Sequence, residues 1–288
     1  MFATLLGALP RPPRPDDASL EALLEAVVGA QKRAGLEPVT DGGLLRDQEP
    51  VAAWLATSAL TERAVKQTLT GPYTRGLDGA AIDPLNRAIR DLADAGCPMV
   101  EVHEPAATGI GDDPDRRARF RDAHLRLLDG VIGTHLSLAI TGGNANGAGI
   151  ETVLAAPYDS LAVDLIAGPD NWHLVVDAPG DRGIVCGVMP AEVDREEGPE
   201  TMLWAAGYAA STMGRGATRV GLASASSFAH LPWDVAVARM TRLGDALRIA
   251  GLPPDERRDA FDPRAVSSRS AALGRSAPPP SRPSRPPR

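Results

Sequence analysis

The chain contains few cysteines and few aromatic residues. It has two cysteines in 288 residues, and Phe, Trp and Tyr together make up 4% of the sequence. Cys97 and Cys186 are isolated in sequence, and each lies beside residues typical of a strand. This pattern predicts two buried, reduced thiols rather than a disulfide framework. A core with so few aromatic rings has to be built mainly from Ala, Leu and Val.

Long apolar runs are also absent. No stretch approaches the roughly 20 apolar residues that cross a bilayer. The N-terminal MFATLLGALP has no basic segment before its short apolar run, unlike a signal peptide. We therefore expect a cytoplasmic protein that does not contact a membrane.

The net charge of −7 is unevenly distributed. Residues 263–288 contain six arginines and no acidic residue, so the preceding 262 residues carry 24 basic and 37 acidic side chains, a net charge of −13. A body this acidic does not attract nucleic acid. We therefore expect a small-molecule ligand rather than a nucleic acid for the main part of the chain.

The end of the chain has a different composition. From Pro253 onward it has nine prolines and few apolar residues, and it ends in PPPSRPSRPPR. We expect residues 253–288 to form a disordered tail with polyproline-like stretches, because so few apolar residues cannot bury a core. Its candidate partners are an anionic surface or a proline-recognising module, although a plain solvated extension is the commoner role of such a sequence.

Over residues 1–252, short apolar and β-branched runs alternate with segments of helical period. The first helix begins at Leu20, with Gly35 as its C-terminal cap. Further helices are expected at Pro84–Ala95, Asp115–Leu128, Pro199–Met213 and Asp234–Ile249, the last with Asp234 as its N-terminal cap. Strands are expected at Ala3–Leu9, Pro38–Asp41, Val65–Thr70, Pro98–His103, Thr134–Ala139, Leu161–Leu165, Ile184–Val188 and Thr218–Ala223, with Trp172–Asp177 as an additional extended piece.

Eight strands separated mostly by helices imply parallel pairing with right-handed crossovers. A single-domain (β/α)8 TIM barrel over residues 1–252 fits this order and the chain length. An open, doubly wound sheet would need a glycine-rich turn after an early strand. The first strand is followed instead by Leu-Pro-Arg-Pro-Pro, so the sequence favours the barrel.

Polar residues gather at the expected strand ends, where such barrels carry their chemistry. Capping of a helix or loop would explain any one of them. Their presence on most strand ends predicts a polar pocket for a small molecule. The candidate residues are Asp41, Thr70, His103, Glu104, His135, Ser137, Asp164, Glu192, Ser224 and His230.

Several local sequences also follow a recognisable order. They are ATLLGALPRP, VKQTLTGP, VEVHEPA, THLS, GVMP and VGLAS. Together they resemble the catalytic domain of cobalamin-independent methionine synthase, within the wider group that includes uroporphyrinogen decarboxylase, over roughly residues 2–250. The resemblance implies a (β/α)8 barrel that transfers a methyl group from a methyl-tetrahydrofolate to homocysteine, whose thiol is activated by zinc.

The resemblance further implies a zinc site made of a His-x-Cys pair, a Glu and a second Cys. The matching positions in this chain are His135, Ser137, Asp164 and Ser224. A serine hydroxyl does not ionise near neutral pH, whereas a thiol does so readily beside a metal. We therefore expect no thiolate zinc site and no bound zinc.

Other positions implied by the resemblance also differ. The Asp that binds the amino acid is His103 here, and the His that follows strand seven is replaced by Glu192. The acidic residue of the strand-two turn is Gly43, with Asp41 nearby. Homocysteine is therefore in question as the substrate. Methyl-tetrahydrofolate remains the candidate co-substrate.

The candidate catalytic residues for such a transfer are Glu192, His230 and His135. Glu192 or His230 would act as general acid on the leaving pterin nitrogen, and His135 as base on the acceptor. The candidate substrate-binding residues are Asp41, Thr70, His103 and Glu104.

Three alternatives remain. His103, His135 and Asp164 could converge as a different metal site, suited to iron, manganese or zinc. The chain could instead be a metal-free lyase or decarboxylase in which Arg75 or Arg46 holds an anionic substrate. It could also be a catalytically silent barrel that binds a small molecule.

Overall fold

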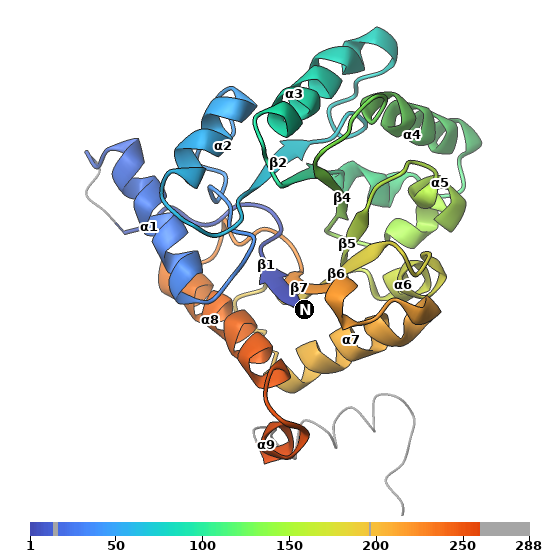
Figure 1. The fold of residues 1–288 in the computed structure, drawn as a ribbon. Helices are drawn as coiled ribbons and strands as arrows, with labels where there is room; N and C mark the ends of the chain where they lie inside the picture. Colours follow the sequence, from blue (N-terminus) through green and yellow to red (C-terminus); the bar gives the residue numbers. More distant parts are fainter. Residues whose placement is uncertain (14–16, 196, 260–288) are drawn as a thin grey trace, which may run out of the picture.

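The computed structural model describes residues 1–13, 17–195 and 197–259. Within these ranges, parallel strands form one curled sheet in the order β1-β7-β6-β5-β4-β3-β2, and helices surround it (Figure 1). The strands are β1 (Phe2–Thr4), β2 (Lys66–Thr70), β3 (Met99–His103), β4 (His135–Ile140), β5 (Ser160–Asp164), β6 (Gly183–Met189) and β7 (Val220–Ser224). The fold is therefore α/β with a seven-stranded parallel sheet.

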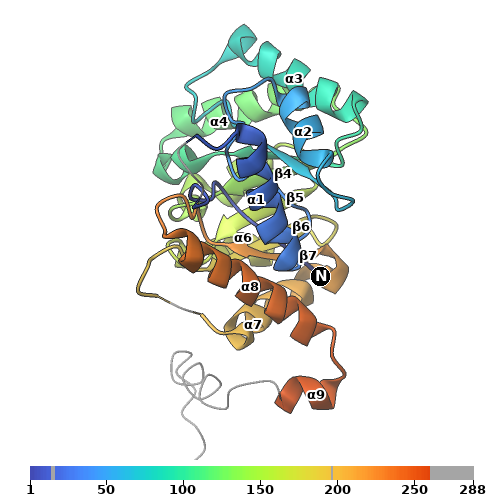
Figure 2. The same ribbon diagram turned by 90° about the vertical axis from the view of Figure 1, so that its left-hand side faces the viewer.

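Helices follow most of the strands, as parallel pairing requires. They are α1 (Leu20–Arg33), α2 (Pro50–Ser58), α3 (Asp83–Asp94), α4 (Pro114–Leu127), α5 (Ile150–Leu154), α6 (Trp172–Asp177), α7 (Pro199–Ser211), α8 (Trp233–Ala250) and α9 (Pro254–Asp259). Helices α1 and α8 lie side by side, so the start and the end of the described chain meet (Figure 2). None of the helices in the described ranges is both long and apolar enough to cross a membrane.

Residues 36–40 lie between the two edge strands, β1 and β2, and we call this segment the seam. Glu37 forms an isolated bridge with Ala3, and Val39 forms one with Val65. The expected strand Pro38–Asp41 is therefore not a regular strand, and the sheet of the described residues has seven strands rather than eight. Pro38 has no N–H to donate to a ladder, which is one reason why pairing here is interrupted.

Three further expectations about the elements are wrong. Trp172–Asp177 is helix α6, because a short apolar run does not by itself distinguish a strand from a helix. Strand β1 ends at Thr4 rather than Leu9, because the N–H of Leu6 bonds to the Ser224 hydroxyl at 2.8 Å instead of joining a backbone ladder.

The expected N-terminal cap of α8 is also displaced. Pro232 occupies the N-cap position without a side-chain hydrogen bond, and Asp234 lies in the first turn, where its carboxylate interacts favourably with the positive end of the helix dipole. The expected C-terminal cap of α1 is displaced by one residue. Gly35 follows the C-cap Ala34 with φ +81, a left-handed conformation that glycine adopts without strain.

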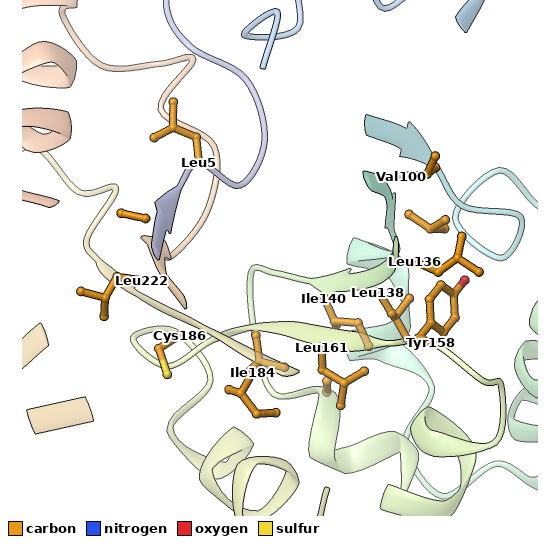
Figure 3. Packing of buried hydrophobic residues seen from close by; sticks show 14 of the residues in the cluster. Leu5, Val100, Leu136, Leu138, Ile140, Tyr158, Leu161, Ile184, Cys186 and Leu222 are labelled. Carbon is orange, nitrogen blue, oxygen red and sulfur yellow. The ribbon is translucent and has the colours of Figure 1, made fainter. Parts of the chain in front are cut away.

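The core has two layers because the sheet is curled. Side chains on the outer face of the strands pack against the helices, and Figure 3 shows Val100, Leu138, Ile184 and Leu222 among them. The inner face carries smaller apolar residues inside the curl, namely Leu6, Ala139, Ala162, Val185 and Ala223. Cys97 and Cys186 are buried and unpaired, as expected.

The expected tail begins with a short helix. Pro254–Asp259 forms α9, so the segment after Pro253 is not polyproline-like from its start. Residues 260–288, which include the six arginines and PPPSRPSRPPR, lie outside the described residues.

Candidate functional site

A small hollow of about 150 Å³ lies at the carboxyl ends of β2 and β3, beside the seam, and we call it the mouth pocket. The residues that line it are Gly7, Ala8, Thr40, Asp41, Gly43, Arg46, Gln67, Thr68, Thr70 and His103. A second hollow of about 470 Å³ shares Arg46, Gln67, Thr68 and Thr70 with it and extends past Arg75. Because they share these four lining residues, the two hollows adjoin.

His103 ends β3 and reaches the mouth pocket with 13% of its side chain exposed. Its Nε2 lies 2.7 Å from Oε1 of Glu101, which is two residues earlier and on the same face of the strand. The Lys66 ammonium donates to the same Oε1 at 2.7 Å and to the carbonyl oxygen of Leu5 at 2.7 Å. We call these three side chains the Lys66–Glu101–His103 network.

The charges of this network depend on burial and pairing. Burial by itself raises the pKa of the Glu101 carboxyl, but the Lys66 charge and the hydrogen bond from His103 outweigh it and lower the pKa to about 2. Burial also lowers the pKa of Lys66, against the pull of Glu101. The lowered pKa of Glu101 favours the charged carboxylate, whereas the lowered pKa of Lys66 favours the neutral amine, so the two shifts disagree on whether the pair is charged. We assign Glu101 as ionised, because two donors converge on its Oε1.

An ionised Glu101 fixes the imidazole of His103. The carboxylate accepts a proton-bearing nitrogen, so Nε2 carries the proton and Nδ1 remains an acceptor in the neutral ring. The arrangement of a carboxylate behind an imidazole is one way in which proteins prepare a general base. Glu101 and Lys66 are therefore the supports of a histidine that faces the mouth pocket.

Asp41 and Thr70 line the mouth pocket together with His103. Both carboxylate oxygens of Asp41 accept backbone N–H groups, from Gly43 at 2.9 Å and from Leu45 at 2.8 Å, which shapes the turn after the seam. Three of the four predicted substrate-binding residues are thus brought together. Their role in binding remains a prediction.

Glu104, the fourth, is fully buried and does not line the mouth pocket. Its two oxygens accept the N–H groups of Tyr73 at 2.8 Å and Thr74 at 2.7 Å. Its side chain packs so closely under Gly71 that a Cβ there would collide with it. The LTGP and Glu-Pro segments that carry the resemblance therefore contact each other, and Glu104 holds the loop after β2 in place.

His135 begins β4 and lies at the opposite end of the sheet from the mouth pocket. Its position is four residues before Ala139, the register partner of His103, which is about 13 Å along the strand. Its Nε2 is 2.8 Å from the Ser160 hydroxyl, and burial lowers its pKa. His135 lines a separate hollow at the amino ends of the strands.

The alternative metal ligands are not brought together. His103 and His135 lie at opposite ends of the sheet, as the strand register shows. Asp164 at the end of β5 uses both oxygens for backbone N–H groups, those of Gly142 at 3.1 Å, Ile166 at 2.9 Å and Ala167 at 2.8 Å. Across the part of the chain that the structure describes, no three or more His, Cys, Asp or Glu side chains could hold one metal ion.

The residues at the implied zinc positions do not fit a zinc ion either. Ser224 both accepts from the N–H of Leu6 at 2.8 Å and donates to its carbonyl oxygen at 3.2 Å, so its hydroxyl joins β7 to the segment after β1. Ser137 is fully buried. Neither hydroxyl provides the anionic sulfur that a thiolate site requires.

Glu192 and His230 lie in the loops after β6 and β7, at the same end of the sheet as His103. Both side chains are exposed. Nε2 of His230 is 3.0 Å from the carbonyl oxygen of Ala191. Neither residue is among those lining the mouth pocket, so the structure brings these two loops together without placing them beside His103. Their catalytic role remains a prediction.

Sequence reasoning missed Lys66 and Glu101. The signal was present, because each is a charged residue within an otherwise apolar or weakly polar strand, in VKQTLT and VEVH. Glu101 is also two residues before His103, the spacing that places both on one face of a strand. A charged residue that faces inward from a parallel strand needs a partner, and Glu101 has two, Lys66 and His103.

The similarity to known proteins is visible in the structure and not in the sequence. No family model and no curated protein matches this sequence. A B12-independent methionine synthase from Shewanella sp. W3-18-1 superposes with a TM-score of 0.68 at 14% identity, over 86% of this chain and 97% of that chain. A Listeria monocytogenes protein assigned as a vitamin-B12-independent methionine synthase gives 0.69 at 13% identity, over 88% and 98%.

A Toxoplasma gondii protein assigned as a deoxyribose-phosphate aldolase is also similar, with a TM-score of 0.50 at 13% identity, over 86% of this chain and 94% of that chain. At these identities the similarity shows the fold alone. The chain therefore has the TIM-barrel-like fold of the methionine synthase-like structures. The same architecture carries several unrelated reactions.

Proposed function

We propose that the chain is an enzyme of the methionine synthase-like barrel type that acts on a small molecule in the mouth pocket, with His103 as its general base. The seam would complete the barrel as its eighth member. The observation that carries the proposal is the buried Glu101 carboxylate, whose hydrogen bond holds the imidazole of His103 in the lining of the mouth pocket.

The nearest reaction is methyl transfer to a thiol such as homocysteine. Nδ1 of His103 would accept the thiol proton as the sulfur attacks the methyl carbon, and the N–CH3 bond of a methyl-tetrahydrofolate would break with its electron pair passing to nitrogen. The proton held on His103, or one from Glu192 or His230, would then neutralise that nitrogen. Base catalysis by an imidazole would take the place of the thiolate zinc.

Substitution tests whether His103, rather than another candidate catalytic residue, is the general base. Replacement of His103 by Gln keeps the size of the ring approximately but removes the base, so we expect kcat for methyl transfer to fall by about 10²–10⁴. His135→Gln is the matched control, because it removes an imidazole at the far end of the sheet. Activity of the His103→Gln variant equal to that of the parent would refute the proposal.

A second candidate function rests on Arg46 and Arg75. Both line the 470 Å³ hollow that adjoins the mouth pocket. Both are exposed, and among the described residues Arg46 bonds through Nε to the carbonyl oxygen of Gly43 at 3.2 Å. Unengaged guanidinium groups in an acidic protein suit a carboxylate or phosphate. This observation favours a metal-free lyase or decarboxylase that acts on an anionic substrate.

The two candidates are distinguished by ligand binding. Methyl-tetrahydrofolate and homocysteine should raise the melting temperature if the first is correct, whereas di- and tricarboxylates should do so if the second is correct. A ligand at a hundred times its Kd adds about 2.7 kcal/mol to the stability. The variant Arg46→Gln/Arg75→Gln should abolish the carboxylate effect, and Arg248→Gln on α8 serves as control.

A further inference from the structure

The carboxylate of Glu101 is unevenly paired. Its Oε1 receives both Lys66 Nζ and His103 Nε2, each at 2.7 Å. Its Oε2 is buried and has no hydrogen-bond partner among the described residues. An ionised, buried oxygen without a donor costs more free energy than an unpaired neutral atom does. The structure therefore points to a missing donor beside Oε2.

The hydroxyl of Ser137 is the second unpaired atom at this place. Ser137 is fully buried, and its Oγ has no partner in the described part of the chain. It is the direct register partner of Glu101 on β4, so the two side chains leave the same face of neighbouring strands. Neither atom bonds to the other. A molecule between them would pair with both.

Thr68 extends this row toward the mouth pocket. It is the register partner of Glu101 on the other side, on β2, and it lines the pocket. Thr68 is half-buried, and its carbonyl oxygen accepts from Nε2 of Gln67 at 3.4 Å. Thr68, Glu101 and Ser137 thus present two hydroxyls and one carboxylate oxygen in one row across three strands. A buried water is typically held by two to four such groups.

We propose that one water molecule binds inside the curled sheet between Glu101 Oε2 and Ser137 Oγ, within reach of Thr68, and that Ser137 is through it a positioning residue for His103. The water donates to Oε2 and completes the pairing of the carboxylate. Without it, the carboxylate would turn or take up a proton, and both changes would weaken the bond from His103 Nε2. The role in positioning rests on the proposed function, whereas the water site itself does not.

The water is sought in the ligand-free, full-length protein. A crystal structure at high resolution should show one ordered water within about 3 Å of both Oε2 and Oγ. In solution, a long-lived water should give cross-peaks to the protons of Ser137 in water-selective NMR spectra. Empty density at this place, together with absent cross-peaks, would overturn the proposal.

The substitutions Ser137→Thr and Ser137→Val test the role in positioning. Thr and Val have nearly the same shape, so the pair differs mainly in the hydroxyl. We expect the Thr variant to keep the water and the Nε2-protonated form of His103, read from ¹⁵N shifts of the labelled ring. We expect the Val variant to lose the water cross-peaks and to gain the Nδ1-protonated form.

The results for the Ser137 variants can be told apart from a failure of the proposed function, because the two are tested by different variants. An unchanged His103 ring in a folded Val variant would refute the positioning role of Ser137, while the activity of His103→Gln would still decide whether His103 is the base. If Ser137→Val does not fold, Ser137→Ala replaces it, because a smaller side chain removes the hydroxyl without crowding. Retention of the Nε2-protonated form in that variant, without the water, would contradict the proposal equally.

Discussion

At the scale of single residues, the charged side chains inside the sheet determine what the site does. Lys66 and Glu101 are both fully buried, and their pairing supports an imidazole at the pocket. A buried ion pair adds little net stability but is costly to break from one side. In the sequence, the only sign of this pairing is that two charged residues occur within apolar strands.

Glu101→Gln tests the pair. The substitution leaves the Lys66 ammonium buried without its counter-charge, so we expect the free energy of unfolding to fall by about 3–5 kcal/mol at neutral pH. Urea unfolding measures it. Lys66→Met/Glu101→Gln removes both charges and should recover much of the loss. A single variant as stable as the parent would show that the pair does not form.

The same carboxyl predicts a pH dependence. Its pKa is lowered from 4.5 to about 2 in the folded protein. The stabilisation is therefore present above pH 4.5 and is lost as the pH falls toward 2. We expect the unfolding free energy of the parent to decline over this window more steeply than that of Lys66→Met/Glu101→Gln. Parallel slopes in the two proteins would contradict the assignment.

At the scale of elements, the alternation of strands and helices was predictable and the exceptions have physical causes. Strands β2 to β7 lie within a few residues of their expected positions, because apolar runs bounded by turns identify buried strands. Helix α6 was mistaken for a strand because its run of six residues is too short to show a helical period. The seam was mistaken for a strand because sequence patterns do not reveal whether a short run is paired.

The candidate site was predictable in part for a related reason. Asp41, Thr70 and His103 were identified from their places at strand ends, and they meet at the mouth pocket. His135 was assigned to the same end through the resemblance, but it starts its strand rather than ending it. The expected strand Thr134–Ala139 already has His135 near its start, and residues at the two ends of one strand lie too far apart to share a site.

Arg215 joins several elements and gives a prediction at this scale. It is buried, and its guanidinium donates to the carbonyl oxygens of Arg182, Ala178 and Ala209, each at 2.8 Å. These lie before β6, after α6 and in α7. Lysine cannot reach all three, and each unpaired buried acceptor costs about 1–3 kcal/mol. We expect Arg215→Lys to lower the unfolding free energy by several kcal/mol, roughly the sum of two such losses.

Thermal or urea unfolding measures this effect. Arg219→Lys is the control, since Arg219 lies four residues later and is exposed. Both substitutions keep the positive charge, so a loss of similar size in both variants would contradict the role of the bonds from Arg215 to the three carbonyl groups.

At the scale of the whole molecule, the curled sheet is continuous from β1 through β7 to β2 but is joined across the seam by isolated bridges. The N–H of Glu37 bonds to the carbonyl oxygen of Ala3 at 2.8 Å, and that of Val39 to Ala64 at 2.9 Å. The N–H of Lys66 bonds in turn to the carbonyl oxygen of Val39 at 3.0 Å, so few backbone bonds have to break before this part opens. Local opening costs the least free energy where such bonds are few.

We therefore expect the amide hydrogens of Glu37 and Val39 to exchange with solvent faster than those of Leu138 and Ala162 in the middle of the sheet. Hydrogen exchange followed by NMR or mass spectrometry measures the difference. Equal protection at the seam and in the central strands would show that the seam is held as firmly as a regular strand.

The position of the seam gives it a practical use. Thr40 and Asp41, which come directly after Val39, line the mouth pocket. A compound that binds in the mouth pocket would stabilise the seam, the segment that we expect to open most readily. The amide hydrogens of the seam would then exchange more slowly. Deuterium uptake at Val39 could thus report occupancy for any compound in a library, before a reaction or a product is known.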